Sequence, residues 1–239
     1  KYFDKIELIY LPKYISVLKC GMKLLSKRPY QILYFESSEF KHKLNCFLSK
    51  NEVDIIHTQH LRMSQYTSEL KQYKRILDLP DAYSLYWKRR TEMKSNFFIN
   101  LFHNIEYRKV LKYEEVIKKY DLNLVCSQED KDFLINKHGI ENIDLLPNGV
   151  DTSSFKSDGH NYGIENRLIF TGNMDYFPNI DAVQYFVSDI FPHLLMIFPD
   201  LKFYIVGQKA VKQVKELESE SIIITGFVDD LSKEYDKST

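Results

Sequence analysis

Two histidines follow one short apolar run and could take part in proton transfer or hydrogen bonding. The run at 53–56 is followed by His57 and His60, and imidazole changes its protonation state near neutral pH. Either ring could hydrogen-bond a hydroxyl group or assist the movement of its proton. A histidine at the end of a strand can equally be satisfied by backbone groups, so both interpretations stay open.

Two aspartates and a basic run follow the next apolar run. Asp78 and Asp81 lie on either side of Pro80, and they could be read as the paired carboxylates of a hydrolase. Their position after a strand and around a proline favours turn and cap chemistry instead. The basic run Lys88–Arg90 could meet a phosphate or an acidic acceptor, but three consecutive cations are typical of a solvated helix face.

Glycine ends each of three predicted strands in the second half of the chain. Gly172, Gly207 and Gly226 each follow a short apolar run, at the strand end where the ligand of an open parallel sheet lies. Backbone amides exposed there could hold phosphate. A single glycine is explained by a tight strand-to-helix turn, but three in one repeat favour a ligand-binding edge.

The elements that must position these residues alternate between short apolar runs and amphipathic segments, which predicts an α/β fold with parallel sheets. Strands are predicted at 6–10, 31–35, 53–58, 75–79, 122–127 and 143–146, and then at 167–172, 201–206 and 222–226. A long helix is expected over 97–120. Ser127 and Gly139 have the residue types that begin and end a further helix, and Pro178 can open another.

The segment 146–151, followed by Phe155, separates two series of alternating strands and helices. We predict an N-terminal Rossmann-like domain at 1–146, a hinge at 147–160 and a partial C-terminal Rossmann-like domain at 161–239. The residues that identify the hinge are Pro147, Asn148, Gly149 and Asp151. Two such domains joined by one linker are expected to leave a cleft between them, where function usually lies.

Composition excludes several classes of protein. Of 239 residues 44% are hydrophobic, enough for a packed core, while 33 basic and 33 acidic residues cancel and argue against a nucleic-acid partner. Three widely spaced cysteines lack metal-ligand or redox spacing and fit a reducing cytoplasm. No apolar run approaches the roughly 20 residues that span a bilayer, although peripheral membrane contact stays open. The glycine motifs of dehydrogenases, P-loop proteins and α/β-hydrolases do not occur.

Several motifs occur in a familiar order: the hinge at 147–151 with Phe155, then 169–176, 178–179, 203–207 and 226–230. Together they resemble family-4 glycosyltransferases of the GT-B fold. The segments 77–84, 88–90, 113–114 and 125–130 resemble, more narrowly, the sugar transferases associated with bacterial exopolysaccharide clusters.

The resemblance implies two Rossmann-like domains facing a cleft, and a retaining transfer of a sugar from a nucleotide-diphosphate donor to an acceptor hydroxyl. Polysaccharide or glycoconjugate biosynthesis would be the setting, with a saccharide or lipid-linked acceptor and neither metal nor other cofactor. The donor would lie mainly on the second domain. The residues implied are Gly172 and Asn173 near the phosphates, Gly207, Gly226, Phe227 and Val228 near the nucleotide, and His60 and His57 as catalytic candidates.

The resemblance also implies that the chain is a fragment. The family's opening strand with its glycine-rich loop would precede Lys1, and its paired-glutamate motif would follow Thr239, so both domains are expected to be incomplete and the fragment inactive by itself. Where relatives often carry a cation after Gly172, this chain has Asn173, Met174 and Asp175. The alternatives are a nucleotide-sugar epimerase of the same fold and a noncatalytic remnant or interaction domain. The expected location is the cytoplasm, with the inner face of the membrane left open.

Overall fold

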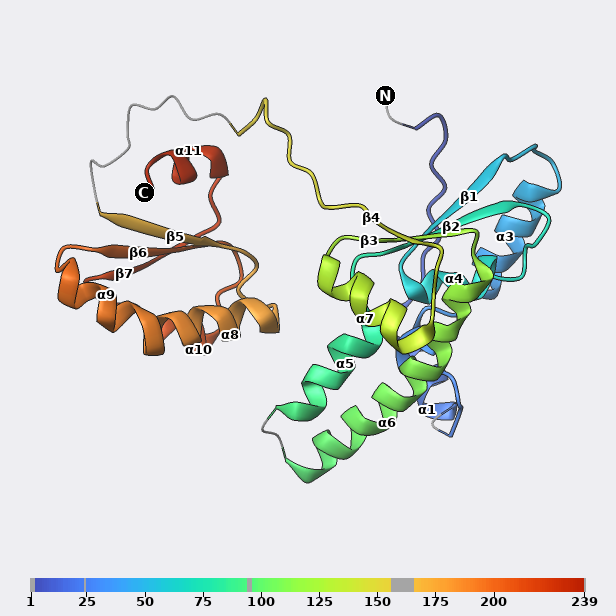
Figure 1. The fold of residues 1–239 in the computed structure, drawn as a ribbon, viewed down its shortest axis with the longest axis horizontal. Coiled ribbons are helices and arrows are strands. Elements are labelled where there is room, and N and C mark those ends of the chain that lie inside the picture. The colour runs from blue at the N-terminus through green and yellow to red at the C-terminus, as the bar shows by residue number, and fades with distance from the viewer. Residues whose placement is uncertain (1–2, 24, 94–95, 156–165, 239) are drawn as a thin grey trace. The chain divides into compact units, whose positions relative to one another are not determined.

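The computed structural model describes residues 3–23, 25–93, 96–155 and 166–238. The chain divides into two compact units, unit 1 (Lys1–Asn148) and unit 2 (Gly149–Thr239). Each unit holds one parallel sheet with helices beside it (Figure 1). The predicted α/β class with parallel sheets is confirmed.

Unit 1 is built on four parallel strands that follow one another in sequence order. They are β1 (Ile55–Gln59), β2 (Lys74–Leu79), β3 (Leu122–Val125) and β4 (Ile143–Leu145). Leu77 and Leu79 of β2 and Val125 of β3 are buried in the core, as expected for central strands covered by helices. Because all four strands are parallel, their carboxyl ends meet at one edge of the sheet.

The helical segments of unit 1 are α1 (Lys13–Met22), α2 (Tyr30–Tyr34), α3 (Ser38–Leu48), η1 (Leu61–Met63), α4 (Ser64–Thr67), α5 (Tyr83–Glu92), α6 (Phe97–Glu114), η2 (Glu115–Lys119) and α7 (Gln128–His138). The long helix predicted over 97–120 is α6 continued by the 3-10 turn η2. The predicted ends of α7 are confirmed. Ser127 accepts a hydrogen bond from the Asp130 amide, and Gly139 ends the helix with a φ of 63°.

The strand predicted at 31–35 is wrong, because this segment forms the helix α2. An apolar run of this length does not distinguish a buried strand from a buried helix. The deciding partner is far away in sequence: the Tyr30 amide donates a hydrogen bond of 2.6 Å to Oε1 of Glu106, in α6. A carboxylate at the first turn stabilises the helix start.

The strand predicted at 6–10 is also wrong. The segment is extended and leaves Ile6, Leu8 and Tyr10 exposed. A strand needs a hydrogen-bonded neighbour, and within the described residues no strand pairs with this segment.

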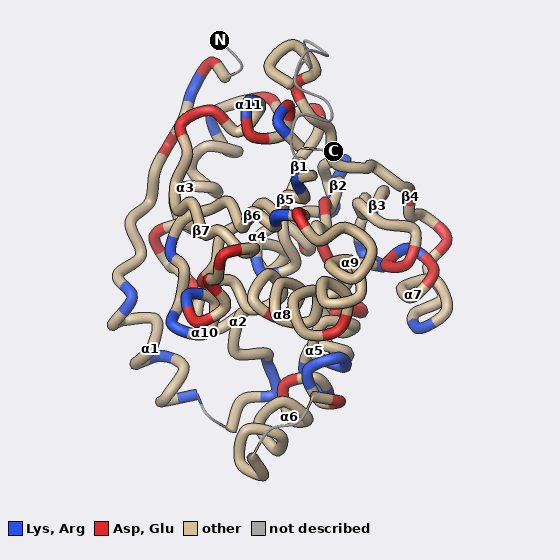
Figure 2. Tube along the Cα trace, turned by 90° about the vertical axis from the view of Figure 1, so that its left-hand side faces the viewer, with Lys and Arg blue, Asp and Glu red and all other residues tan. Residues whose placement is uncertain are grey.

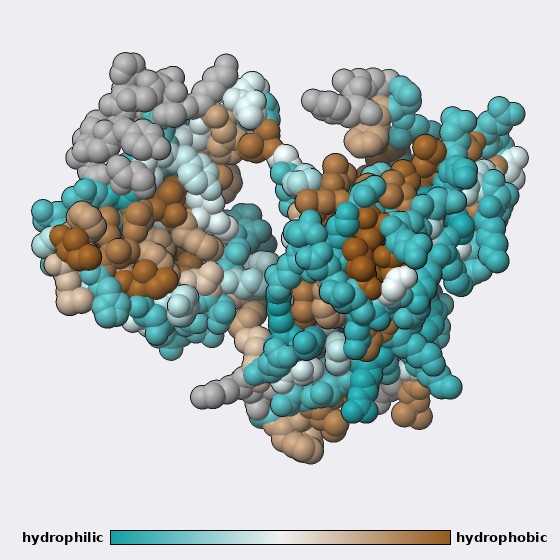
Figure 3. Space-filling view, viewed as in Figure 1, coloured by the Kyte–Doolittle hydropathy of each residue, from teal (hydrophilic) through white to brown (hydrophobic). Residues whose placement is uncertain are grey.

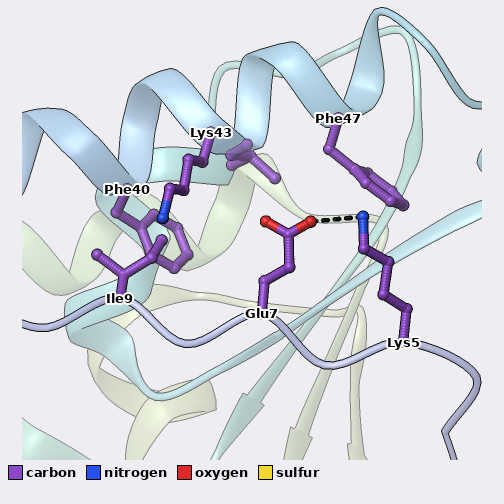
Figure 4. Close-up of a pocket in the computed structure, with 7 residues that line it drawn as sticks. Lys5, Glu7, Ile9, Phe40, Lys43 and Phe47 are labelled. Carbon is purple, nitrogen blue, oxygen red and sulfur yellow. Dashed lines mark ion pairs between the residues drawn. The ribbon is translucent and has the colours of Figure 1, made fainter.

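The same N-terminal segment lies against α3 and forms a small pocket there (Figure 4). Glu7 and Ile9 line it opposite Phe40 and Phe47 of α3. Lys5 pairs with Glu7 at 2.6 Å and so lowers the pKa of that carboxyl group. The pocket includes no residue that the sequence predicts to be functional.

Unit 2 has three parallel strands in the order β5 (Arg167–Thr171), β6 (Lys202–Val206) and β7 (Ile222–Gly226). Its helical segments are α8 (Phe177–Tyr185), the π turn η3 (Phe186–Ile190), α9 (Phe191–Ile197), α10 (Lys212–Lys215) and α11 (Leu231–Asp236). Figure 1 shows α8, α9 and α10 on one face of this sheet and α11 on the other. Phe203 and Ile205 of β6 lie in the core beneath Val183 of α8.

Candidate functional sites

The carboxyl edges of both sheets carry unusual backbone. Among the described residues, the non-glycine residues with a left-handed φ are His60, at 71°, and Lys209, at 62°. His60 follows β1 in unit 1, and Lys209 follows β6 in unit 2. Strained backbone concentrates at functional sites, and ligands of parallel sheets lie at this edge. The two edges are therefore the candidate sites, one in each unit.

In unit 2, Gly207 is required by close contact between two loops. A Cβ placed on it would lie 1.7 Å from the carbonyl oxygen of Gly172, and its φ of 153° also favours glycine. The Gly172 amide donates to Val206 and the Gly207 amide donates to Gly226, each at 3.0 Å. These two amides therefore donate their hydrogen bonds to carbonyl groups of the neighbouring strands.

The space beside Gly172 is filled by a side chain. A Cβ there would lie 2.6 Å from Nδ2 of Asn179, and that nitrogen donates to the Asn173 carbonyl at 3.0 Å. Met174, which is fully buried, donates its amide to the Gln208 carbonyl at 3.0 Å. The loops after β5 and β6 thus form one structure, in which the Asn173 side chain is exposed.

A cation that the sequence analysis missed lies at this edge. Nζ of Lys209 is 3.5 Å from Oδ2 of Asp175, and both side chains are largely solvent-accessible. The family resemblance places a basic residue soon after Gly172, but Lys209 comes from the loop of the neighbouring strand. Its place two residues after Gly207 was the available signal.

The end of β7 completes the edge of unit 2. Gly226 has a φ of 73°, and a Cβ added to it would meet no atom within 4 Å. Phe227 is 71% exposed, and Val228 is half-buried. This edge therefore presents an aromatic ring, an ammonium group and polar loop groups, a combination that suits a nucleotide.

In unit 1, the backbone and side chain of His60 are both held in place. Its amide donates to the Asp78 carbonyl at 2.8 Å, and its Nδ1 lies 2.8 Å from the Tyr83 hydroxyl. Burial, helped by nearby Arg62, lowers the pKa of the imidazole, so the ring is neutral at pH 7. With Nδ1 engaged, the imidazole can offer Nε2 to a ligand.

A carboxyl group with a raised pKa lies in the electrostatic field of His60. Partial burial of the carboxyl group raises the pKa of Asp81, and the like charge of Asp130 adds to the effect. Asp130 is fixed by hydrogen bonds from the Ala82 amide, at 3.1 Å, and from the Ser127 hydroxyl, at 2.6 Å. A neutral imidazole and a carboxyl group that gains a proton readily are suited to proton transfer.

Three other candidate residues of unit 1 are Asp81, His57 and Arg89. The capping role expected for Asp81 is wrong, because the N-cap of α5 is Ala82, whose side chain makes no capping hydrogen bond. His57 lies inside β1, with Nε2 3.3 Å from Oδ2 of Asp78. In the basic run, Arg89 pairs with Glu129 of α7 rather than with solvent alone.

The predicted hinge is exposed from Pro147 to Val150, and the division between the units falls at Asn148 and Gly149. Asp151 accepts hydrogen bonds from the Ser153 hydroxyl, at 2.6 Å, and the Ser154 hydroxyl, at 2.8 Å. These bonds lower its pKa to about 2. Residues 156–160 of the predicted hinge lie outside the described residues.

In the described part of the chain, no group of three His, Cys, Asp or Glu side chains could hold a metal ion, and no helix is long and apolar enough to cross a membrane.

Comparison with known proteins bears on unit 2. Residues 165–239 match the family model described as "Glycosyl transferases group 1". This match supports a glycosyltransferase relationship. It covers β5 to α11 and hence the whole glycine edge described above. No curated protein matches the chain significantly.

Three solved structures are similar to the chain at low identity. TarM has 16% identity and a TM-score of 0.45, over 74% of this chain and 38% of its own. MnaA of S. aureus, solved with UDP, has 12% identity and a TM-score of 0.42, and the match covers 83% of this chain and 53% of MnaA. An alpha,alpha-trehalose 6-phosphate synthase from Burkholderia multivorans has 12% identity and a TM-score of 0.46, and the match covers 94% of this chain and 60% of the synthase. The chain thus spans less than two thirds of the length of each.

Proposed function

We propose that the chain belongs to a glycosyltransferase that moves a sugar from a nucleotide-diphosphate donor to an acceptor hydroxyl. The observation that carries the proposal is the family match over 165–239, because it includes all three strand ends at the candidate edge of unit 2. We also propose retention of configuration at the sugar, and an acceptor that is a saccharide or a lipid-linked saccharide of a polysaccharide or glycoconjugate pathway.

At the edge of unit 2, the proposal assigns the diphosphate to Lys209 and to the loop at Asn173. A departing diphosphate gains negative charge, and a fixed cation with oriented amides stabilises that charge without a metal ion. The Gly172 and Gly207 amides already serve the sheet. These glycines therefore support binding through the close approach of their loops, while Phe227 offers a ring to the base.

At the edge of unit 1, the proposal assigns His60 to a hydroxyl group of the reactants. Its neutral ring can accept or donate a hydrogen bond through Nε2 because Tyr83 engages Nδ1. His57 has a weaker claim, since it lies within β1 and faces Asp78. Transfer is expected to persist in the presence of a chelator.

The first experiment measures nucleotide binding. UDP and GDP are titrated separately, and hydrogen exchange of the chain is followed with and without each. The expected result is protection of the peptides that cover 172–176, 207–209 and 226–228. If neither nucleotide nor any other nucleoside diphosphate protects these peptides, the proposal is wrong.

The variant that tests the edge is Lys209→Gln, with Lys212→Gln as its matched control. Lys212 lies in the same unit but pairs with Glu216 on the surface of α10. Loss of one charge-assisted contact to phosphate should weaken nucleotide binding about tenfold, or about 1.4 kcal/mol, only for Lys209→Gln. Equal affinity of the two variants would remove Lys209 from the site.

The alternative function is tested by product analysis. A rearranged sugar formed from the donor without any acceptor would identify an epimerase.

A further inference from the structure

Unit 1 exposes two apolar helix faces. On α1, the side chains of Tyr14, Val17, Leu18 and Met22 are exposed, and their spacing puts them on one face of the helix. Helical faces of this kind are normally buried against a core. Here the face is turned to solvent.

The second face belongs to the first turns of α6. Phe97 and Phe98 are 75% and 79% exposed, and Leu101 follows on the same side. A shallow hollow on α6 is lined by Phe97, Leu101 and Ile105. Large exposed aromatic side chains in a cluster mark an interaction surface.

Both faces lie at the same end of unit 1. Figures 1 and 2 agree in placing α1 and the start of α6 there, and in Figure 1 the hairpin of α5 and α6 extends away from the sheet. Figure 3 shows brown, hydrophobic surface at this end. We call the exposed side chains of α1 and of the first two turns of α6 the apolar tip.

The two helices of the apolar tip are joined through α2. Glu106 of α6 accepts the Tyr30 amide, and the Tyr30 ring packs edge-on against Phe102 with centroids 5.5 Å apart. On the other side, the Cys20 thiol of α1 reaches the Tyr30 carbonyl at 3.7 Å. These contacts hold both faces in one arrangement.

The apolar tip is surrounded by positive charge, although the whole chain is neutral. Residues 13–36 contain five cations, Lys13, Lys19, Lys23, Lys27 and Arg28, against one acidic residue, Glu36, which pairs with Lys23 and Arg28. In α6, Arg108, Lys109 and Lys112 are accompanied by two acids, Glu106 and Glu114, and both of these are buried. Figure 2 shows blue, basic segments along α1.

We propose that the apolar tip docks unit 1 onto the surface of an anionic phospholipid bilayer. Apolar side chains enter the interface between headgroups and acyl chains, and the flanking lysines and arginines meet lipid phosphates. The charge favours this occupant over a second copy of the chain, because two basic tips would repel each other. The inference does not depend on the function proposed for the carboxyl edges.

A single tryptophan provides a reporter for the test. Trp87 of α5 is the only tryptophan in the chain, and its ring lies 6.0 Å from that of Phe102. The chain is mixed with vesicles of phosphatidylcholine alone, or of phosphatidylcholine with phosphatidylglycerol, and binding is measured by co-sedimentation. Nitroxide-labelled lipid in the same vesicles should quench Trp87 fluorescence.

The expected result is binding to the anionic vesicles that weakens as salt is raised, with little binding to phosphatidylcholine alone. The double variant Phe97→Ser with Phe98→Ser should bind at least about tenfold more weakly. Its matched control, Met196→Ser with Ile197→Ser, removes two exposed apolar side chains from α9 and should bind like the unaltered chain. Since all four side chains are exposed, thermal unfolding should be similar in both variants.

The charge is tested in the same way. Lys13→Gln with Lys27→Gln should also weaken binding about tenfold or more, whereas Lys212→Gln with Lys215→Gln should not. The proposal is overturned if anionic vesicles bind none of the proteins, or if they bind the Phe97 and Phe98 variant as well as the unaltered chain. Self-association that this variant abolishes, without vesicle binding, would identify the tip as an interface between copies.

Discussion

At the scale of single residues, His60 combines strain with chemical capability. Its left-handed φ is costly for a residue with a β-carbon, yet hydrogen bonds with Asp78 and Tyr83 hold it in place. A structural residue at this turn would be expected to be glycine, which adopts the conformation freely. The presence of an imidazole there, with a pKa lowered by burial, supports its place in the proposed reaction.

Two variants separate the strain from the chemistry. His60→Ala and His60→Gly both remove the imidazole and its bond to Tyr83, but only glycine relieves the backbone. Denaturant unfolding should therefore find His60→Gly more stable than His60→Ala by about 1 kcal/mol. Sugar transfer should fall alike in both variants. Equal stability of the two would show that the turn is not strained.

At the scale of elements, a buried polar network attaches α7 to the rest of unit 1. Nε2 of His138, the last residue of α7, lies 3.1 Å from Glu114 of α6, and its Nδ1 lies 2.8 Å from Glu115 of η2. Glu114 also accepts the Ser84 amide of α5 at 3.2 Å. Burial by itself disfavours a charged imidazole, but hydrogen bonds with the two glutamates outweigh it and raise the pKa of His138.

This network predicts a pH-dependent stability. Because the pKa of His138 in the folded state is above its ordinary value of 6.5, the contribution of the charged ring is fully present below that pH. It is lost as the pH rises through the folded-state value. Replacing His138 by Gln should therefore cost about 3 kcal/mol at about pH 6 and clearly less at about pH 9. Unfolding of both proteins at the two pH values measures this, and an equal cost would mean that the ring is neutral in the fold.

At the scale of the whole molecule, the two units have separate cores. The buried cluster of unit 1 lies within residues 32–143, and that of unit 2 lies within 174–222, with no residue in common. Each sheet is covered by helices of its own unit. Each unit is therefore expected to have its own free energy of unfolding.

Reciprocal core variants test this independence. Ile205→Ala empties part of the unit 2 core and should destabilise that unit by about 3 kcal/mol, while Leu77→Ala should do the same to unit 1. Native-state hydrogen exchange of peptides from β6 and β2 reports on each unit. Each variant should speed exchange in its own unit alone. Loss of protection in both units from either variant would mean that they unfold as one.

Much of the fold could be predicted from the order of residues, because strand and helix periodicity is carried by neighbours in the chain. The apolar runs that became β1 to β7 and the caps of α7 at Ser127 and Gly139 are of this kind. The three glycines of unit 2 could also be placed from local sequence, because each follows or ends an apolar run that forms a strand. The family match over residues 165–239 likewise depends on the sequence alone.

Tertiary structure alone decided what depends on groups distant in sequence. Glu106 of α6 accepts the Tyr30 amide at the start of α2, and Lys209 pairs with Asp175 across neighbouring loops. The strain of His60 arises because its amide must meet the Asp78 carbonyl of the adjacent strand. Likewise, α1 and α6 make one apolar tip only because the fold brings both helices to the same end of unit 1 (Figure 1). Local sequence does not encode such tertiary contacts, because each hydrogen bond or ion pair depends on a partner that is distant in the chain.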